Sequence, residues 1–244
     1  MLPKADRVQV CSRENGEYLA SFVPALRGRI DDGYRAGIDT SSYSFRTGGR
    51  EPDTILFLGS FRHLPNQEAL DWFLRLVMPR VLERVPGARL KVVGAEPPPA
   101  HFVPHYAVPH VDLLGFVDDV REPLNRYAVF VCPILSGSGV RVKLLEAFAA
   151  GMPVVSTLLG AEGLAQVDGE ICALADDPAA FADRVVRLLL EPDHATELAC
   201  RAREFVVRER DMAVITARLA DSYRETIRRM RTGTQDFGVS AGGD

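Results

Sequence analysis

The chain has 244 residues, of which 47% are hydrophobic and 25% are charged, and its formal net charge is −4 at neutral pH. This composition is typical of a globular protein with a hydrophobic core, and the slightly acidic balance gives no reason to expect a nucleic-acid partner. No apolar run approaches the roughly 20 residues that span a bilayer, and the N-terminus lacks the apolar region of a signal peptide. The sequence therefore predicts a cytoplasmic protein of one large domain, or of one domain and part of another.

The N-terminal residues 6–45 predict a single strand–helix–strand unit. Its parts are the strand DRVQVCS, the helix RENGEYLASFVPAL and the strand RIDDGYRAGID. A unit of this size cannot bury a core by itself, so we expect it to belong to a larger domain. The polar, glycine-containing segment TSSYSFRTGGREPD (40–53) then predicts a linker.

Short apolar runs rich in β-branched residues follow the linker, and each ends in glycine, proline or polar residues. These runs are TILFLG (54–59), RLKVVG (89–94), VDLLG (111–115), AVFVCP (128–133), PVVST (153–157) and EICAL (170–174). Their nearly continuous apolar character is typical of strands that are covered on both faces, as in a parallel sheet. Cys132 and Cys172 lie within these runs, which predicts buried, reduced thiols.

Helical patterns alternate with these strands. Residues 66–86 predict a helix that begins at the N-cap candidate Asn66 and kinks at Pro79, and residues 140–151 predict a second helix, closed by Gly151. A third helix is expected over 177–192. The alternation predicts an α/β fold, namely a doubly wound, Rossmann-like parallel sheet.

The C-terminal part has a different pattern. Residues 193–230 predict two helical segments rich in i,i+4 charge pairs, and RTGTQDFGVSAGGD (231–244) predicts a disordered tail. The segment RETIRRMR carries a basic cluster, for which we consider weak contact with an anionic membrane surface or an ordinary solvated helix end.

In a doubly wound sheet of strand order 3-2-1-4-5-6, a ligand binds where the loops after strands one and four face each other. If TILFLG is strand one, these loops are GSFRHLPN (59–66) and ILSGSGVRVK (134–143). Gly137 and Gly139 lack a Cβ, so their backbone amides can approach a ligand closely. The helix that begins near residue 140 adds unpaired N–H groups and a positive dipole end, which suit a phosphate.

Charged side chains extend this predicted ligand site. Arg141 and Lys143 place positive charge beside the glycines, and Glu146 lies three residues beyond Lys143 on the same helix face. A carboxylate there could accept hydrogen bonds from a ribose diol. The pattern favours a nucleoside diphosphate, and the competing interpretation is a glycine-rich turn with an ordinary surface Lys143–Glu146 pair.

The segment GSGVRVKLLEAFAAGMPVVSTLLGAEGL resembles the signature block of the family-4 glycosyltransferases, which have the two-domain GT-B fold. The resemblance extends through FLGSFRHLPNQEALDWF, ARLKVVG, LLGFVDDVREPLNRYAVFVCP and ADRVQVCS, and it covers roughly residues 4–225 in the family's order. It implies the donor-binding C-terminal domain of a retaining, nucleotide-sugar-dependent glycosyltransferase.

The resemblance also implies a division of the chain. Residues 1–45 would be a remnant of the N-terminal acceptor domain with the hinge, and 46–210 the Rossmann-like nucleotide-sugar-binding domain. Residues 211–230 would form the C-terminal crossover helix, followed by the tail 231–244. We therefore expect a truncated enzyme, or a donor domain whose acceptor domain is a separate partner chain. No catalytic residue is assigned, because groups from the acceptor domain are missing.

Site residues follow from the motifs. Glu146 matches the second glutamate of the family's Glu-x7-Glu motif, implied to bind the donor ribose, while the first glutamate is replaced by Ser138. Arg141 and Lys143 match a G-x-R-x-K variant of the block and would bind the diphosphate, together with Gly137 and Gly139. Two further loops would contribute Gly59 and Arg62, and Phe116 and Val117, the latter pair next to the nucleobase.

The implied chemistry needs no metal and no cofactor besides the nucleotide-sugar substrate. His101, His105 and His110 lie in a proline-rich loop without metal-ligand spacing, so we expect no metal site there. A non-catalytic nucleotide-binding or interaction module derived from this fold is the alternative function. An NAD-dependent enzyme is disfavoured because no G-x-G-x-x-G follows strand one.

Overall fold

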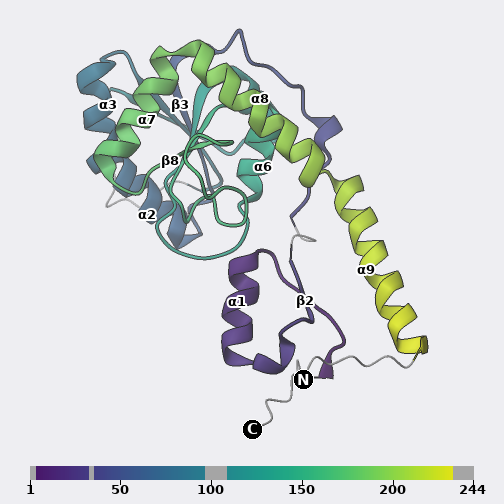
Figure 1. Ribbon diagram of the computed structural model, residues 1–244. Helices are drawn as coiled ribbons and strands as arrows, with labels where there is room; N and C mark the ends of the chain where they lie inside the picture. Colours follow the sequence, from purple (N-terminus) through teal and green to yellow (C-terminus); the bar gives the residue numbers. More distant parts are fainter. Residues whose placement is uncertain (1–3, 33–35, 97–108, 233–244) are drawn as a thin grey trace.

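The computed structural model describes residues 4–32, 36–96 and 109–232 (Figure 1). Its central element is a six-stranded sheet of order β5-β4-β3-β6-β7-β8, in which every neighbouring pair is parallel. Its strands are β3 (Glu51–Leu58), β4 (Arg89–Val93), β5 (Val111–Gly115), β6 (Tyr127–Cys132), β7 (Val154–Ser156) and β8 (Ala173–Leu174). This order is 3-2-1-4-5-6, so the predicted doubly wound topology is confirmed.

The two central strands form the core of the sheet. Ile55 and Leu56 of β3 pair with Val129 and Phe130 of β6, and all four side chains are buried. Strands that are buried on both faces need the continuous apolar runs seen in the sequence. The strand order reverses between β3 and β6, so the chain leaves these two strands toward opposite faces of the sheet, which is where ligands bind in doubly wound sheets.

Helices cover both faces of the sheet. The helices are α2 (Leu64–Trp72), α3 (Met78–Arg84), α5 (Arg121–Arg126), α6 (Val142–Ala149), α7 (Pro178–Leu190) and α8 (Pro192–Glu209). Helix α7 packs on the sheet beside α2 and α3, whereas α5 and α6 lie on the opposite face with α8 against α6 (Figure 1). This arrangement follows from right-handed crossovers that change sides at the switch point.

The predicted helix over 66–86 is interrupted. It begins at Leu64, with His63 in the N-cap position, and a π-helical turn η4 (Phe73–Val77) separates α2 from α3. Pro79 is the second residue of α3, where its missing N–H is tolerated, so the expected kink takes the form of a π-helical turn. The prediction that Asn66 caps this helix is wrong, because the Asn66 side chain bonds to Lys143 and to the Ser60 carbonyl instead.

The N-terminal strand–helix–strand unit is confirmed, with shorter strands than expected. Strand β1 (Val8–Gln9) pairs in parallel with β2 (Ile30–Asp31), and α1 (Arg13–Phe22) and the 3-10 turn η2 (Pro24–Leu26) connect them. Figure 1 shows this unit beyond the loops of the large sheet, with α1 closest to them.

The segment 40–53 is more than a linker. It contains a 3-10 turn η3 (Thr40–Ser42), and β3 already begins at Glu51. Arg50 donates hydrogen bonds to the carbonyls of Leu124 (2.5 Å), Tyr127 (2.9 Å), Arg46 (2.8 Å) and Ala150 (3.0 Å). Burial lowers the pKa of Arg50 to about 10. The sequence prediction missed these contacts because a polar, glycine-containing run does not show which side chains reach the domain.

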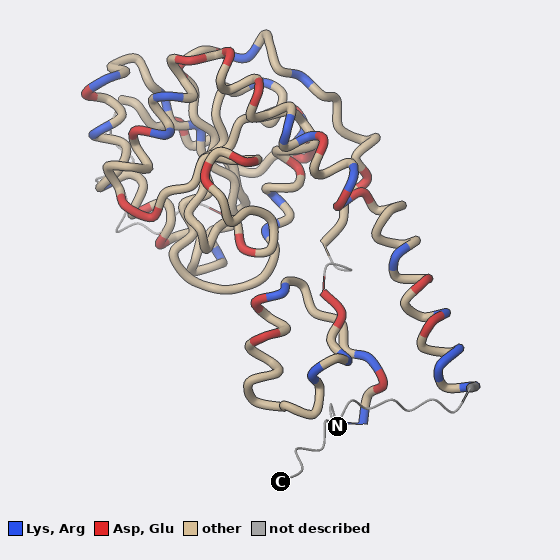
Figure 2. The backbone as a smooth tube through the Cα atoms, in the orientation of Figure 1, with Lys and Arg blue, Asp and Glu red and all other residues tan. Residues whose placement is uncertain are grey.

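Helix α9 (Met212–Thr232) leaves the large domain and runs back beside the N-terminal unit (Figure 1). The Met212 N–H donates to the Ile38 carbonyl (2.8 Å), and the Ser222 hydroxyl donates to Asp31 of β2 (2.8 Å). Basic and acidic residues alternate along this helix (Figure 2). Helix α9 includes Arg231 and Thr232, which were expected in the tail; the rest of the predicted tail lies outside the described residues.

Cys132 and Cys172 are buried, as predicted, and burial raises the pKa of both thiols. Among the helices of the described residues, none has both the length and the apolar character needed to cross a membrane.

Candidate functional site

The loops after β3 and β6 meet at the C-terminal edge of the sheet. Lys143, near the start of α6, donates hydrogen bonds to the Leu58 carbonyl at the end of β3 (2.9 Å) and to the side-chain oxygen of Asn66 on α2 (3.0 Å). The Ser136 hydroxyl also donates a hydrogen bond to the Glu68 carboxylate on α2 (2.5 Å). The predicted meeting of these two loops at the switch point is therefore observed.

Lys143 carries a positive charge without a negative partner. Both of its hydrogen-bond acceptors are neutral, and within the described residues it forms no ion pair. Burial and the nearby Arg141 lower the pKa of the Lys143 ammonium, and its Nζ lies 5.4 Å from the centroid of the Phe57 ring. An anion that approached this ammonium would relieve the cost of its desolvation.

Arg141 is the second cation of the loop. Its guanidinium donates to the carbonyls of Ser138 (2.6 Å) and Gly139 (2.8 Å), and its buried Nη2 has no hydrogen-bond partner. Among the residues the structure describes, no carboxylate pairs with it. Two adjacent cations whose only partners are neutral create a local positive potential, which attracts a diphosphate.

Glycines shape the two loops for close backbone approach. Gly139 has a φ of +90°, a left-handed conformation that glycine adopts without strain. A Cβ on Gly59 would lie 2.7 Å from the Asn66 side chain, so glycine at this position leaves room for the residue that binds Lys143. Gly59 thus acts through Asn66 and through the shape of the loop.

Glu146 lies one turn further along α6. The Tyr43 hydroxyl donates to its Oε1 at 2.9 Å. Burial raises the pKa of the Glu146 carboxyl, and the hydrogen bond from Tyr43 opposes that effect. The alternative of a Lys143–Glu146 surface pair is wrong, because neither side chain bonds the other and each binds a different segment.

The other predicted residues have different surroundings. Phe116 is 69% exposed after β5, and Val117 packs against the core beside it. Arg62 is turned to Glu96, with 2.5 Å between Nε and Oε1, so the structure pairs this guanidinium with a carboxylate instead of joining it to Arg141 and Lys143. Ser138 is exposed at the tip of the glycine-rich loop.

Glu162, in the loop after β7, joins the glycine-rich loop to the N-terminal unit. Its Oε2 accepts from the Gly139 N–H (3.1 Å), and its Oε1 accepts from Ser12 (3.0 Å) and Asn15 (2.9 Å). Ser12 is also the N-cap of α1, since its hydroxyl accepts from the Asn15 N–H. The Glu162 carboxylate thus accepts the Gly139 N–H of the candidate phosphate loop, and the same carboxylate holds the start of α1 next to that loop.

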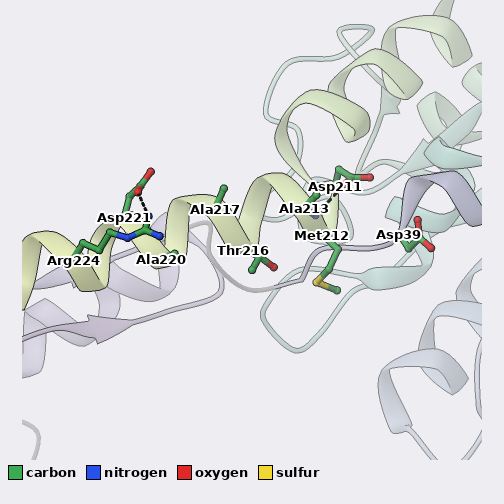
Figure 3. Close-up of a pocket in the computed structure, with 9 residues that line it drawn as sticks. All are labelled: Asp39, Asp211, Met212, Ala213, Thr216, Ala217, Ala220, Asp221 and Arg224. Carbon is green, nitrogen blue, oxygen red and sulfur yellow. Dashed lines mark hydrogen bonds and ion pairs between the residues drawn. The ribbon is translucent and has the colours of Figure 1, made fainter.

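A cavity of about 780 Å³ lies between α1 and the C-terminal ends of β6, β7 and β8. Gly137 and Ser138 line it, together with polar side chains that include Asn15, Glu162 and Asp176 and with a group of apolar side chains from the strand ends and the loop after β7. A second cavity, of about 790 Å³, lies along α9 (Figure 3). It contains none of the predicted donor-binding residues, so we place the candidate site at the first cavity and the adjoining loops.

Of the three histidines considered as metal ligands, His110 lies within the described residues. His101 and His105 lie outside the described residues, and within those ranges no group of three or more His, Cys, Asp or Glu side chains could hold a metal ion.

Three residues of the site escaped assignment from the sequence. Tyr43 lies in a stretch that reads as a linker, although an aromatic residue in a polar run was a signal of packing. Asn66 was assigned as a helix cap, and Glu162 lies within the signature block but outside its charged motif. Each of them acts through a contact with a residue more than 20 positions away, which a local pattern does not reveal.

The sheet order and the glycine-rich loop at its switch point define a Rossmann-like α/β domain, with the parallel sheet of one domain of a GT-B glycosyltransferase. The chain belongs to the family described as glycosyl transferases group 1, whose family model matches residues 52–191. The resemblance seen in the signature block is thereby confirmed.

Several curated proteins are similar in sequence to this chain. The chain is 30% identical over 204 residues to the phosphatidyl-myo-inositol mannosyltransferase of Mycobacterium tuberculosis, which covers 78% of this chain and 53% of that protein. A protein encoded in the cps region of Klebsiella pneumoniae is 27% identical over 62% of this chain and 41% of its own length. The chain spans about half the length of the curated relatives it matches.

Solved structures share the fold. Sucrose-phosphate synthase of Thermosynechococcus elongatus superposes with a TM-score of 0.75 at 20% identity, over 93% of this chain and 60% of that one. The pneumococcal O-GlcNAc transferase, solved in complex with UDP and GlcNAc, gives a TM-score of 0.65 at 15% identity, over 93% of this chain and 46% of that one.

Proposed function

We propose that this chain is the donor-binding part of a retaining glycosyltransferase that uses a nucleoside diphosphate sugar. The observation that carries the proposal is the pair of cations at the switch point of the sheet: among the described residues, Arg141 and Lys143 donate hydrogen bonds to neutral oxygens only. A diphosphate supplies the missing negative charge, and it does so next to a glycine-rich loop and the start of α6. UDP in the complex of a structural neighbour supports the same ligand class.

The remaining site residues account for the rest of the donor. Glu146 accepts hydrogen bonds from the ribose, and the exposed Phe116, with Val117 and the backbone beside it, contacts the nucleobase. The sugar extends past Ser138 into the cavity under α1, whose side-chain amides and carboxylates suit sugar hydroxyls. Because Ser138 replaces a glutamate of the family motif, the sugar contacts in this chain come from other cavity residues.

In the proposed reaction, the bond between the anomeric carbon and the terminal diphosphate oxygen breaks, the acceptor oxygen bonds to the same carbon on the same face, and the proton of the acceptor hydroxyl passes to the departing diphosphate. Negative charge develops on that oxygen, and Arg141, Lys143 and the loop amides stabilise it in the transition state. This arrangement supplies the electrostatic stabilisation without a metal. The acceptor hydroxyl enters from the side of α1, and a full acceptor domain, in the same or a partner chain, completes the site.

Isothermal titration calorimetry of the full 244-residue chain with UDP, GDP and ADP tests the donor site. We expect one nucleotide to bind, and Lys143→Met and Arg141→Met each to weaken its binding at least about tenfold, because each removes a charge-assisted contact. Lys4→Met, at an exposed lysine, is the matched control and leaves the affinity unchanged.

Circular dichroism melting of each variant separates loss of binding from loss of the fold. If none of the three nucleotides binds the folded wild-type chain at millimolar concentration, the proposed donor site is wrong. Binding without sugar transfer, even after an acceptor domain is added, favours the alternative of a non-catalytic nucleotide-binding module. Retained anomeric configuration in a transfer product, read by NMR coupling constants, is the expected stereochemistry.

A further inference from the structure

Tyr43 connects the segment before β3 to the predicted ribose carboxylate. Its hydroxyl donates to Glu146 Oε1 at 2.9 Å across 103 positions of sequence. In the described part of the chain this is the one hydrogen bond that the Glu146 carboxylate receives. Oε1 is therefore held by the protein, while Oε2 keeps its full capacity to accept from a ligand.

Tyr43 is itself held in place. Its ring packs against the hydrophobic core. Arg121, at the start of α5, donates to the carbonyl of the neighbouring Ser42 (3.3 Å) and pairs with Asp119 (2.7 Å). Arg121 and Asp119 also act electrostatically on the Tyr43 hydroxyl, in addition to Glu146. The Tyr43 segment is thus fixed between α6 and the loop after β5, which carries Phe116.

The physical consequence concerns the freedom of Glu146. A glutamate side chain samples many rotamers, and each must be given up when the carboxylate binds a diol in one geometry. A hydrogen bond from a tyrosine whose ring is already packed removes much of that freedom before the ligand arrives. The same bond favours the ionised carboxylate, which accepts from hydroxyls more strongly than the neutral acid does.

We propose that Tyr43 is a positioning residue that holds Glu146 for the donor ribose and thereby makes the site selective for ribonucleotides. This inference rests on the proposed function, because it takes the ribose diol as the ligand of Glu146. Tyr43 acts through Glu146 and does not touch the reacting atoms. Its own side chain contributes the hydroxyl for positioning and the ring for packing.

The test compares two ligands in two variants. Affinities are measured by calorimetry for the nucleotide that binds best and for its 2′,3′-dideoxy counterpart, which lacks both hydroxyls. Tyr43→Phe keeps the ring and removes the hydroxyl, so the fold is retained. We expect the ribo-to-dideoxy affinity ratio to fall about fivefold in this variant, through weaker binding of the ribonucleotide alone.

Two controls isolate the mechanism. Tyr223→Phe, at a tyrosine that is 53% exposed on α9, leaves the ratio unchanged. In a Glu146→Gln background, Tyr43→Phe has no further effect on the ratio, since both changes act on one interaction. A merely structural role would lower the melting temperature and weaken both ligands equally.

The outcomes distinguish this inference from the proposed function. If the wild-type chain binds the nucleotide and Tyr43→Phe leaves the ratio unchanged, the positioning role is wrong and the donor site stands. A tighter ribonucleotide complex in Tyr43→Phe also overturns it, because the hydroxyl would then compete with the ribose. A wild-type chain that binds no nucleotide overturns both.

Discussion

At the scale of single residues, the cations of the glycine-rich loop differ from the surface cations of the chain. Arg62, Arg121 and Arg126 each pair with a carboxylate, and such exposed pairs contribute little to stability. Lys143 and Arg141 instead donate to neutral oxygens at the end of the sheet. This unpaired charge is a cost to the isolated fold that an anionic ligand offsets.

Glu146 leads to a prediction about pH. Burial raises the pKa of its carboxyl, so the group takes up a proton at a higher pH than an exposed glutamate does. We expect the affinity for a nucleotide sugar to fall about fivefold between about pH 7 and about pH 5, since the protonated carboxyl accepts hydrogen bonds from the ribose more weakly. Calorimetric titration over this range measures the effect.

The ligand and the control in this experiment exclude other titrations. A nucleotide sugar has no terminal phosphate group with a pKa of about 6, unlike UDP. The pKa of Lys143 is lowered, so acidification can only increase its charge and would tighten binding instead. Glu146→Gln is expected to bind weakly at every pH in the range. A variant that keeps the wild-type pH dependence would show that another group is responsible.

Which residues were predictable depended on where their partners lie. The glycines, Arg141, Lys143 and Glu146 form one contiguous motif, so their local spacing was sufficient. Tyr43 and Glu162 act across 103 and 23 positions respectively, and only the fold brings them to Glu146 and Gly139. Arg62 was placed in the correct loop, but its pairing with Glu96 depends on how the next loop folds.

At the scale of elements, the most regular features were the most predictable. Helix α7 has its N-cap at Asp177, and its buried residues Phe181, Val185 and Leu188 recur at helical spacing. Helix α2 was less predictable at its start, because Pro65 lies one residue before Asn66 and permits an earlier first turn. Pro79 explains why the helix is interrupted near this position, but the sequence does not show that the interruption takes the form of a π-helical turn.

The cap of α7 provides a stability prediction. Asp177 accepts hydrogen bonds from the N–H groups of Ala179 (2.9 Å) and Ala180 (3.0 Å). Asp177→Ala leaves both without a partner and removes a negative charge from the positive end of the helix. We expect the free energy of unfolding to decrease by about 1 kcal/mol, measured as a lower urea midpoint. Asp177→Asn keeps a capping oxygen and is expected to lose clearly less; an equal loss in both variants would contradict the capping explanation.

At the scale of the whole molecule, a small N-terminal unit is attached to a large α/β domain through few polar contacts. Glu162 accepts two of them, from Ser12 and Asn15, and Gln166 donates another to Glu14 (2.8 Å). The large domain has its own core, whereas the unit of β1, α1 and β2 buries little apolar surface apart from Leu26. We therefore expect the unit to open locally at a lower free energy than the sheet.

Hydrogen exchange can test this coupling. Glu162→Ala removes the acceptor shared by Ser12, Asn15 and Gly139, so the amides of α1 are expected to exchange at least about fivefold faster. The amides of β3 and β6 are expected to keep their protection. Glu170→Ala, at an exposed glutamate after the same strand, is the matched control. Faster exchange throughout the sheet would show general destabilisation and contradict this coupling.

The sequence by itself determined the class of sheet and the motif that carries the cations. Buried parallel strands require continuous apolar runs, and a ligand loop at a switch point requires glycine and charge in close spacing. The tertiary structure alone decided the partners of that motif: Asn66 for Lys143, Tyr43 for Glu146 and Glu162 for Gly139. The physical reason is that hydrogen bonds between distant segments depend on how the helices and loops pack around the sheet, and residue spacing records only contacts within a segment.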